Sequence, residues 1–419
     1  MQAGKAPIVV VGAGAAGMMA AIFAAEGETP VLLLERTRDG GRKILISGGG
    51  RCNVLPSVLE PSRFVTLSSS HTLRRMLLGW PLAEQRRFFE EELGVPLALE
   101  PETGKLFPVS NRARDVRDAL LAMAHVRGVE QRFNTRMVGL DPHPAAGSWL
   151  VRLEGGEDLP AAAVILATGG LSVPTTGSDG AGLAIAGRLG HLLHPTFPAL
   201  TSLTADPPRH SVLAGISLEA RLETTGPEGR LATEGGFLFT HRGYSGPAVL
   251  DLSHVAVLSR LRGGPRPSLT VRWCRLEERD WERLLRGESG RVETILRRHL
   301  PDRLTGRLLS EAGVTGSTDL SQLRRGDRRR LVEHLTRYPL PWTGDEGYRK
   351  AEVTGGGIAL SEVHPGSLES RRHPGLFLCG EMLDAFGPIG GHNFVWAWAT
   401  GRAAGRGAAR KVGATMADS

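Results

Sequence analysis

A glycine triplet between two apolar runs constrains the fold of this chain more than any other feature. Residues 8–11 read IVVV, Gly12, Gly14 and Gly17 follow, and residues 31–34 read VLLL. Apolar runs of this length are typical of strands buried in a parallel sheet. In the G-x-G-x-x-G spacing, the first glycine permits a sharp turn, the second lets the backbone approach a diphosphate, and the third lets a helix pack on the strand. These residues predict a strand–helix–strand unit that binds a dinucleotide.

Two further features of this stretch support the same prediction. A helix expected over residues 15–25 would point its N-terminal N–H groups, and the positive end of its dipole, at the diphosphate. Glu35 stands eighteen residues after Gly17, at the end of the second strand, where a carboxylate that binds ribose belongs. No other G-x-G-x-x-G in this chain follows a strand directly, so we expect one nucleotide-binding domain and no separate domain for a nicotinamide.

Length and composition fit an α/β protein with more than one domain. The chain has 419 residues, and its 55 glycines and few aromatic residues suit alternating strands and helices that approach a cofactor closely. Three scattered cysteines are too few for a disulfide framework or a metal cluster, which favours the cytoplasm. No apolar run reaches about 18 residues and glycines interrupt the apolar start, so neither a membrane span nor a signal peptide is expected.

The charge balance is basic, with 51 Lys and Arg against 44 Asp and Glu and a formal net charge of +7. Such a surplus suits an anionic partner, but an Arg-, Ala- and Gly-rich composition explains it equally well. The densest basic cluster, Arg324–Arg325 and Arg328–Arg330, lies in a charged helical stretch. It is compatible with contact to a phosphate backbone or with a solvated helix face.

Several Gly-rich stretches far apart in the chain have the features of a cofactor site. Gly40–Lys43 can bring donors to phosphate and ribose, and the glycines of Ser47–Asn53 leave backbone amides uncovered beside a flat ring. One buried strand ends in Ala167–Gly170 and another in Gly380–Glu381, where the carboxylate can accept a hydrogen bond from a sugar-alcohol hydroxyl. Gly390–Gly391 then open a helix whose N-terminus suits the negative charge of a reduced ring. Because both chain ends are expected to converge on one elongated ligand, the pattern favours FAD over NAD.

The expected FAD site draws on most of these stretches. It also includes Met137, which is expected where a nucleotide base could rest. Met137 lies within residues 129–140, a segment expected to form an antiparallel strand over the sheet. The residues expected to bind FAD are Gly12, Gly14, Ala15, Ala16, Gly17, Glu35, Arg36, Arg42, Lys43, Ser47, Gly48, Gly49, Asn53, Met137, Ala167, Thr168, Gly169, Gly380, Glu381, Gly390, Gly391, Asn393 and Phe394.

The chain resembles the BaiN/RdsA family of FAD-dependent flavoproteins in six segments: GAGAAG, GRKILISGGGRCN, ATGGLSVPTTGSDG, FTHRGYSGPAVL, AEVTGGGI and GEMLDAFGPIGGHNFVWAWATG. Together they span nearly the whole chain. The resemblance implies a Rossmann-like FAD-binding domain of the two-dinucleotide-binding-domain type, residues 1–190 and 351–419. It also implies an inserted β-barrel-like domain, residues 191–274 and 339–350, which carries a helical domain, residues 275–338. The chain departs from the family at His392, where Tyr or Phe is usual.

The resemblance implies an oxidoreductase, but the branches of the family act on different substrates. One branch of the family looks like a dihydrouridine synthase that reduces the C5–C6 double bond of a uridine in 23S rRNA, and FTHRGYSGPAVL and EGYRKAEVT are most similar to it. The basic charge agrees with RNA. We therefore expect a cytoplasmic enzyme in which NAD(P)H reduces FAD transiently and a hydride passes to rRNA or a ribosomal particle. A small-amine oxidase, a reductase of a small enone, and a non-catalytic flavin-bearing ribosome-assembly factor are the alternatives.

Reduction of a uracil double bond requires a proton donor as well as a hydride. Cys52 is the first candidate because a thiol beside the flavin can give up a proton, and His241 is the second. Arg51 and Arg242 would hold a carbonyl or a phosphate. Simple packing of Cys52 and a structural role of His241 are equally compatible with the sequence.

Overall fold

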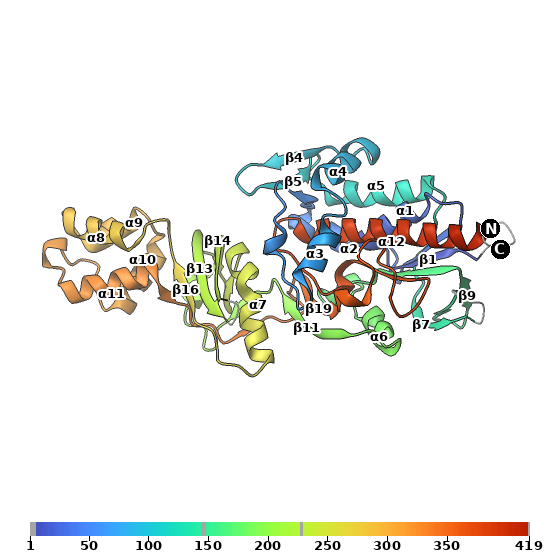
Figure 1. Cartoon of the computed structure of the whole chain (residues 1–419). Helices are drawn as coiled ribbons and strands as arrows, with labels where there is room; N and C mark the ends of the chain where they lie inside the picture. The colour runs from blue at the N-terminus through green and yellow to red at the C-terminus, as the bar shows by residue number, and fades with distance from the viewer. Residues whose placement is uncertain (1–5, 144–147, 227–228, 418–419) are drawn as a thin grey trace. The chain divides into compact units, whose positions relative to one another are not determined.

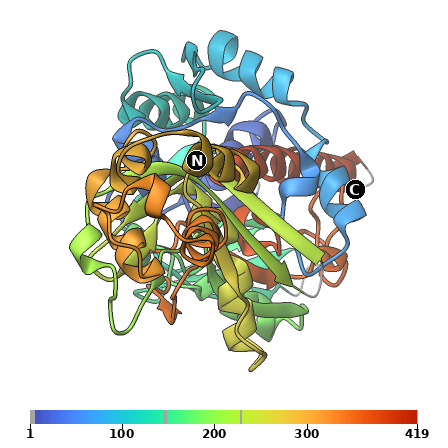
Figure 2. The same ribbon diagram turned by 90° about the vertical axis from the view of Figure 1, so that its left-hand side faces the viewer.

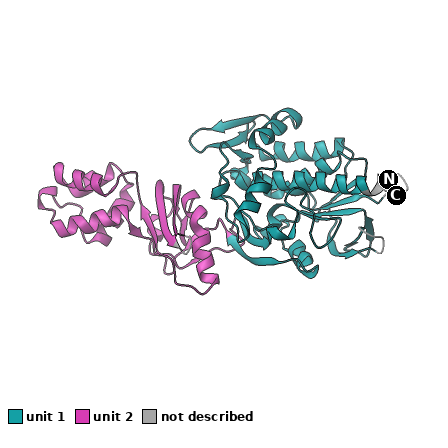
Figure 3. Ribbon diagram, in the orientation of Figure 1, with its two compact units in different colours: residues 1–198, 352–419 teal, residues 199–351 magenta. Residues whose placement is uncertain are grey.

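The structure, a computed structural model, describes residues 6–143, 148–226 and 229–417. The chain divides into two compact units, residues 1–198 with 352–419 and residues 199–351, coloured separately in Figure 3. The first unit is made from both ends of the chain, and the second is inserted between them. The expected separation of a β-rich domain from a helical domain within the insertion stays a prediction.

A five-stranded parallel sheet forms the centre of the first unit and confirms the α/β class. Its apolar strands are buried, as the sequence pattern predicts. At the carboxyl ends of the strands Val11 lies between Leu34 and Leu166, so segments far apart in the sequence end at one edge. The strands in spatial order are β20 (Leu376–Leu378), β10 (Ala163–Leu166), β1 (Ile8–Val11), β2 (Val31–Leu34) and β6 (Glu130–Arg132).

Two helices from opposite ends of the chain lie side by side in this unit, α1 (Ala15–Ala24) and α12 (His392–Ala417) (Figure 1). Glycines in α12 permit their close approach. A Cβ added at Gly401 would lie 2.3 Å from the carbonyl oxygen of Ala16, and one added at Gly405 would lie 2.3 Å from that of Ala20. The C-terminal helix thus packs almost backbone to backbone on the helix that follows the glycine triplet.

Smaller sheets and helices complete the first unit. The expectation of one antiparallel strand over residues 129–140 is wrong in part, because residues 130–132 form β6, which pairs in parallel with β2. Helix α5 precedes β6 and makes the crossover that a parallel pairing requires. The other elements are α2 (Arg42–Ile46), β3 (Leu55–Pro56), α3 (Ser70–Leu77), α4 (Leu82–Arg87), β4 (Leu97–Glu100), β5 (Lys105–Pro108), α5 (Ala113–Val126), β7 (Met137–Pro142), β8 (Trp149–Leu153), β9 (Asp158–Ala161), α6 (Ala181–Arg188), β11 (Leu193–Ala199) and β19 (Val353–Ile358).

The second unit combines a seven-stranded antiparallel sheet with a helical cluster. Strand residues such as Leu222 and Val271 share one hydrophobic cluster with Trp281, Leu308 and Leu331 of the helices. The helices α8–α11 gather together in both ribbon views (Figure 2). The elements are β12 (Leu203–Thr204), β13 (Ser217–Gly226), β14 (Gly229–Phe239), β15 (Gly243–Ser245), α7 (Pro247–Leu261), β16 (Leu269–Arg272), α8 (Glu278–Gly287), α9 (Val292–Arg297), α10 (Asp302–Ala312), α11 (Arg325–Thr336), β17 (Tyr338–Pro339) and β18 (Gly344–Asp345).

A buried polar network ties the helical cluster to the sheet of the second unit. His210 contacts the Tyr244 hydroxyl at 2.9 Å through Nδ1, and Glu311 of α10 at 3.3 Å through Nε2. The Tyr338 hydroxyl donates to Glu311 at 2.6 Å, as does Arg307 Nε at 2.6 Å. Burial raises the pKa of Glu311, but these donors outweigh it and hold the pKa at about 2. Glu311 therefore stays ionised and keeps its donors at neutral pH.

Three observations bear on the class of protein. The cysteines are free thiols, and Cys52 and Cys379 are buried. No group of His, Cys, Asp and Glu side chains in the described ranges could hold a metal ion. No helix among the same residues is both long and apolar enough to cross a bilayer.

The approach of α12 to α1 gives a first prediction. We expect Gly405→Ala to destabilise the fold by about 1–3 kcal/mol, because the added methyl meets the α1 backbone and forces the helices apart. Gly413→Ala makes the same change in the same helix where a Cβ meets nothing within 4 Å, so it should be neutral or stabilise by up to about 1 kcal/mol. Thermal and denaturant unfolding of both variants measure the difference, and equal effects would contradict it.

Candidate functional site

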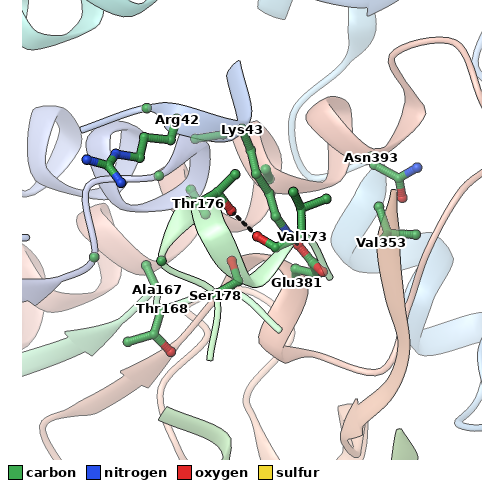
Figure 4. Close-up of a pocket in the computed structure, with 18 of the residues that line it drawn as sticks. Arg42, Lys43, Ala167, Thr168, Val173, Thr176, Ser178, Val353, Glu381 and Asn393 are labelled. Atoms are coloured by element: carbon green, nitrogen blue, oxygen red, sulfur yellow. Dashed lines mark hydrogen bonds and ion pairs between the residues drawn. The ribbon is translucent and has the colours of Figure 1, made fainter. Parts of the chain in front are cut away.

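A cavity of about 490 Å³ lies in the first unit, at the edge of the central sheet where β1, β2 and β10 end. Ligands of open α/β sheets bind at this edge, and the volume lies within the range of ligand pockets. Its lining comes from both ends of the chain: the turn before α1, helix α2 and the glycine turn after it, the segment after β10, and the start of α12 (Figure 4).

The three glycines of the triplet are required for three different reasons. Gly12 has φ +102°, and an added Cβ would lie 2.6 Å from the carbonyl oxygen of Ala167. At Gly17 a Cβ would lie 1.7 Å from the Gly12 carbonyl oxygen, so this glycine lets α1 pack on the turn. Gly14 has an ordinary φ of −81°, and a Cβ there would meet nothing within 4 Å. Neither backbone strain nor packing therefore explains why position 14 is glycine. The space that a side chain would fill there belongs to the cavity.

The start of α1 presents backbone donors to this space. Gly14 is the N-cap of the helix, no side chain caps its N–H groups, and the first turn has no acidic residue. Uncapped N–H groups and the positive end of the helix dipole suit a diphosphate. A diphosphate that approaches the backbone at Gly14 would therefore meet the positive end of the α1 dipole.

Glu35 is held rigidly at the end of β2. Its carboxylate accepts hydrogen bonds from the backbone N–H of Ala13 at 2.8 Å and from the N–H and hydroxyl of Thr37 at 2.8 and 2.7 Å. The residue is 8% exposed and lines the cavity. Because its oxygens are oriented by the turn before α1, the geometry suits the expected hydrogen bond to a ribose.

A second carboxylate, Glu381, lies at the other side of the cavity in a polar cluster. Lys43 of α2 donates to Glu381 and to the Ser172 hydroxyl, each at 2.7 Å. Figure 4 shows the Lys43 side chain pointing toward Glu381. Ser172 and the backbone N–H of Thr354 donate to the remaining oxygen of Glu381 at 2.7 and 2.9 Å. Burial raises the pKa of Glu381, but the Lys43 ammonium and these hydrogen bonds lower it below its ordinary value. Glu381 is thus an ionised acceptor at the cavity wall.

The glycine turn after α2 also opens toward the cavity. Gly49 has φ +68°, and a Cβ there would meet nothing within 4 Å, whereas one at Gly48 would press on Asn53 and Phe107 at 3.0 Å. Gly48, Gly49 and Asn53 all line the cavity. The uncovered backbone predicted for this stretch is therefore present at the cavity wall.

The start of α12 completes the wall, and its unusual histidine is turned away from it. Asn393 closes the turn by accepting from the Gly387 N–H and donating to the Gly387 carbonyl, both at 2.9 Å. His392 is 5% exposed, does not line the cavity and packs edge-on against Phe64 at a ring distance of 6.0 Å. Burial, with a smaller effect of Arg63, lowers the pKa of His392 to about 4. His392 is therefore a neutral, buried imidazole at the start of α12.

The structure gathers nearly all of the residues predicted to bind FAD. Every one of them lines the cavity except Gly17, which packs beneath the turn, and Gly380. A Cβ at Gly380 would lie 2.7 Å from the Cβ of Ala16, so this glycine shapes the wall from behind. The assignment of these residues to FAD stays a prediction, but their common location matches it.

None of the four predicted catalytic residues lines the cavity. Cys52 is fully buried with φ +63°, and burial raises the pKa of its thiol to about 12. Arg51 is paired with Glu100 at 3.0 Å and lies over the ring of Phe107. These two side chains are thus occupied by packing and by an ion pair.

The other two candidates belong to the inserted unit. His241 and Arg242 lie in the exposed turn between β14 and β15, and Arg242 is 3.9 Å from Glu346. All four belong to motifs expected at the site, but membership of a motif does not determine where a side chain points.

The sequence indicates that residues 105–108 lie near the cofactor, but it assigns no role to Lys105, at the start of β5. Five cationic side chains line the cavity, and Lys105 alone among them has no carboxylate within 4 Å in the described part of the chain. The other four are paired, Arg36 with Asp179, Arg42 with Asp39, Lys43 with Glu381, and Arg136 with Glu154 and Asp179. No motif marks Lys105, because β5 reaches the cavity from a separate antiparallel sheet.

Residues 6–407 match the model of the HI0933-like protein Rossmann domain. The chain belongs to the HI0933-like family. It is 32% identical over 401 residues to the ribosomal RNA dihydrouridine synthase of Escherichia coli (strain K12), covering 94% of this chain and 95% of that protein. It is 31% identical over 415 residues to the 3-dehydro-bile acid delta(4,6)-reductase of Clostridium scindens, covering 96% and 99%.

Two solved structures share the fold of this HI0933-like chain. The open conformation of a flavocytochrome c3 fumarate reductase has a TM-score of 0.51 at 17% identity, covering 98% of this chain and 79% of that one. The 3-ketosteroid delta1-dehydrogenase of Sterolibacterium denitrificans has a TM-score of 0.53 at 12% identity, covering 97% and 99%. The family resemblance and the Rossmann-like fold are therefore confirmed, and the chain is an FAD-dependent oxidoreductase.

FAD fits the residues of this cavity. The N-terminus of α1 and Gly14 would receive the diphosphate, Glu35 the ribose, and Glu381 a ribityl hydroxyl. The glycine turn at Gly49 leaves backbone uncovered, against which a ring would fit. When bound, FAD supplies hydride transfer, while these residues position it and balance its charge.

The open space at Gly14 gives the second prediction. We expect Gly14→Val to fold with a melting temperature within a few degrees of the parent apoprotein, but to lose bound FAD, because the side chain would occupy the place of the diphosphate. Gly366→Val is the matched control: Gly366 is exposed, outside this cavity, and a Cβ there also meets nothing within 4 Å. Visible flavin absorbance of the purified proteins is the measurement, and full FAD content in the Gly14 variant would contradict the fit.

Proposed function

We propose that this HI0933-like enzyme uses FAD, reduced by NAD(P)H, to convert a uridine of ribosomal RNA to dihydrouridine. The observation that carries the proposal is similarity over nearly the whole length to a protein named for this activity. The second relative is named as a reductase acting at carbon–carbon double bonds of a bile acid, so reduction of an activated C=C bond is common to both names. Because rRNA is a cytoplasmic polymer, the proposal also assigns the enzyme to the cytoplasm.

Two hydrogens must add across the uracil C5–C6 bond, one as hydride from the reduced flavin and one as a proton from an acid. We propose Lys105 as the proton donor in place of Cys52. Its ammonium group has no carboxylate partner within 4 Å among the described residues. It lies beside the turn that opens α12, since a Cβ at Gly390 would lie 3.4 Å from Lys105 Cε. A hydride from NAD(P)H then reduces the flavin again, and a proton from water restores the ammonium group of Lys105.

The first test is a map of dihydrouridine in rRNA. Deletion of the gene should remove dihydrouridine from one position of 23S rRNA, and the purified holoenzyme with NADH or NADPH should restore it on that RNA. A map identical in the deletion strain and its parent would contradict the proposal. Peroxide release with small amines would instead favour an amine oxidase.

The role of Lys105 can be tested separately. Lys105→Met should keep bound FAD and its reduction by NAD(P)H, but lower dihydrouridine formation by about 10²–10⁴-fold, the usual contribution of a general acid. Lys105→Arg should restore little, because a guanidinium does not release its proton near neutral pH. Lys350→Met, at an exposed lysine of the inserted unit, is the control and should turn over normally. Unchanged turnover and pH profile in Lys105→Met would exclude Lys105.

A reductase of a small enone is the second candidate function. It is favoured by the relative named as a bile acid reductase, which matches this chain almost as closely and over 99% of its own length. Reduction of a steroid enone by the holoenzyme, with rRNA left unmodified, would select it. The distribution of charge between the two units favours the RNA substrate.

A further inference from the structure

The positive charge of this enzyme is concentrated in the inserted unit. Residues 199–351 contain 25 Lys and Arg against 19 Asp and Glu, a net charge of +6. The remaining residues contain 26 against 25, a net charge of +1, although they are the longer part of the chain. A general bias of composition would spread the surplus over both units. The asymmetry therefore points to an anionic partner of the inserted unit.

Within residues 275–338 of this unit, nearly all of the acidic side chains form ion pairs with arginines. Every Asp and Glu there except Asp319 and Glu333 has an arginine within 4 Å. Seven exposed arginines of the same segment have no carboxylate within that distance among the described residues. Arg303 instead donates to the backbone carbonyls of Val212 and Ala214. The other six are Arg275, Arg279, Arg291, Arg324, Arg325 and Arg329. The surplus is thus carried by particular unpaired guanidinium groups.

Three of these arginines gather on one helix. Arg324 is the N-cap of α11, and Arg325 and Arg329 follow one turn apart on one face. Arg291 belongs to the same region, because it forms a β-bridge with Asp319, five residues before Arg324. We call Arg291, Arg324, Arg325 and Arg329 the α11 arginine surface.

The helix beneath this surface is firmly anchored. Leu331, Val332 and Leu335 of α11 are buried in the core of the unit. Arg328, on the inner side, donates to Glu282 of α8 at 3.1 Å. The helical cluster that carries the surface is seen in Figure 2. A rigid helix presents the arginines without the cost of ordering a loop.

We propose that the α11 arginine surface docks the phosphodiester backbone of the RNA substrate. The inference rests on the proposed function for the identity of the polymer. Guanidinium groups match phosphate oxygens with paired hydrogen bonds, and contacts to the backbone position an RNA without reading its sequence. The flavin cavity lies in the other unit and its own cations are paired except Lys105, so binding of a large polyanion depends on the inserted unit.

The test compares two triple variants of the full-length holoenzyme. Arg324→Gln/Arg325→Gln/Arg329→Gln removes three charges from the α11 arginine surface. Arg74→Gln/Arg75→Gln/Arg87→Gln removes three charges from exposed arginines of the first unit, which also have no carboxylate within 4 Å in the described ranges. Binding of each to a 23S rRNA fragment is measured across a salt series, with thermal unfolding and FAD content as checks of folding.

We expect the α11 variant to bind RNA about tenfold more weakly or worse at 0.1 M salt. The slope of log affinity against log salt should fall by about 2–3, since each lost phosphate contact removes nearly one released counterion. The first-unit variant should change affinity less than about twofold and keep the slope. Equal losses in the two variants would overturn the proposal, because attraction would then depend on net charge alone. Loss of binding to anionic phospholipid vesicles, with RNA binding intact, would also overturn it and identify a membrane surface.

Failure of the docking surface and failure of the proposed reaction give different results. If the parent enzyme makes dihydrouridine and the α11 variant binds and modifies RNA like the parent, the docking proposal falls and the reaction stands. If the parent makes no dihydrouridine but binds RNA through these arginines, the docking proposal stands and the reaction falls.

Discussion

The contact on which this structure depends is the packing of α12 against α1. It brings the last helix of the chain to the helix that begins the dinucleotide motif, at a distance that only glycines at positions such as 401 and 405 permit. Because α12 starts at the cavity, this contact also sets the position of Gly390, Gly391 and Asn393 relative to the turn at Gly14. The cavity therefore exists only when both ends of the chain are folded together, and the inserted unit is not needed to form its wall.

The fold could be predicted well where local pattern and function coincide. The buried runs at 8–11 and 31–34, the helix between them and the C-terminal helix after Gly391 all depend on short-range signals, which the sequence displays directly. The same holds for the cavity wall, because glycines at strand ends mark places where backbone meets a ligand. The direction of β6 is harder to predict, because a short polar strand shows no periodicity. Its parallel pairing depends on the crossover helix that precedes it.

Side-chain roles were predicted less well, because they depend on orientation. Cys52 adjoins cavity-lining Asn53, yet its left-handed backbone and full burial turn the thiol into the core. Lys43 was expected to serve phosphate or ribose, but its ammonium group is held by Glu381 and Ser172, which lie 338 and 129 residues away in the chain. Lys105 reaches the cavity on a strand of a separate sheet, and nothing in its neighbourhood resembles a motif. The fold brings such side chains together from distant parts of the chain, so the sequence pattern does not display the grouping.

The two units of the chain meet opposite electrostatic requirements. The cavity must hold a dianionic diphosphate without binding every anion, and each of its cations except Lys105 is neutralised by a nearby carboxylate. The N-terminus of α1, with uncapped N–H groups and no acidic residue in its first turn, then offers a local positive field to the diphosphate. On α11 the situation is reversed: Arg328 pairs with Glu282 of α8 and Arg330 with Asp327, whereas Arg324, Arg325 and Arg329 have no carboxylate within 4 Å among the described residues. A site that must hold one small ligand tightly is thus kept nearly neutral, whereas a surface suited to a long polyanion keeps its charges free. The proposed docking on α11 would thus leave the paired cations of the cavity unchanged.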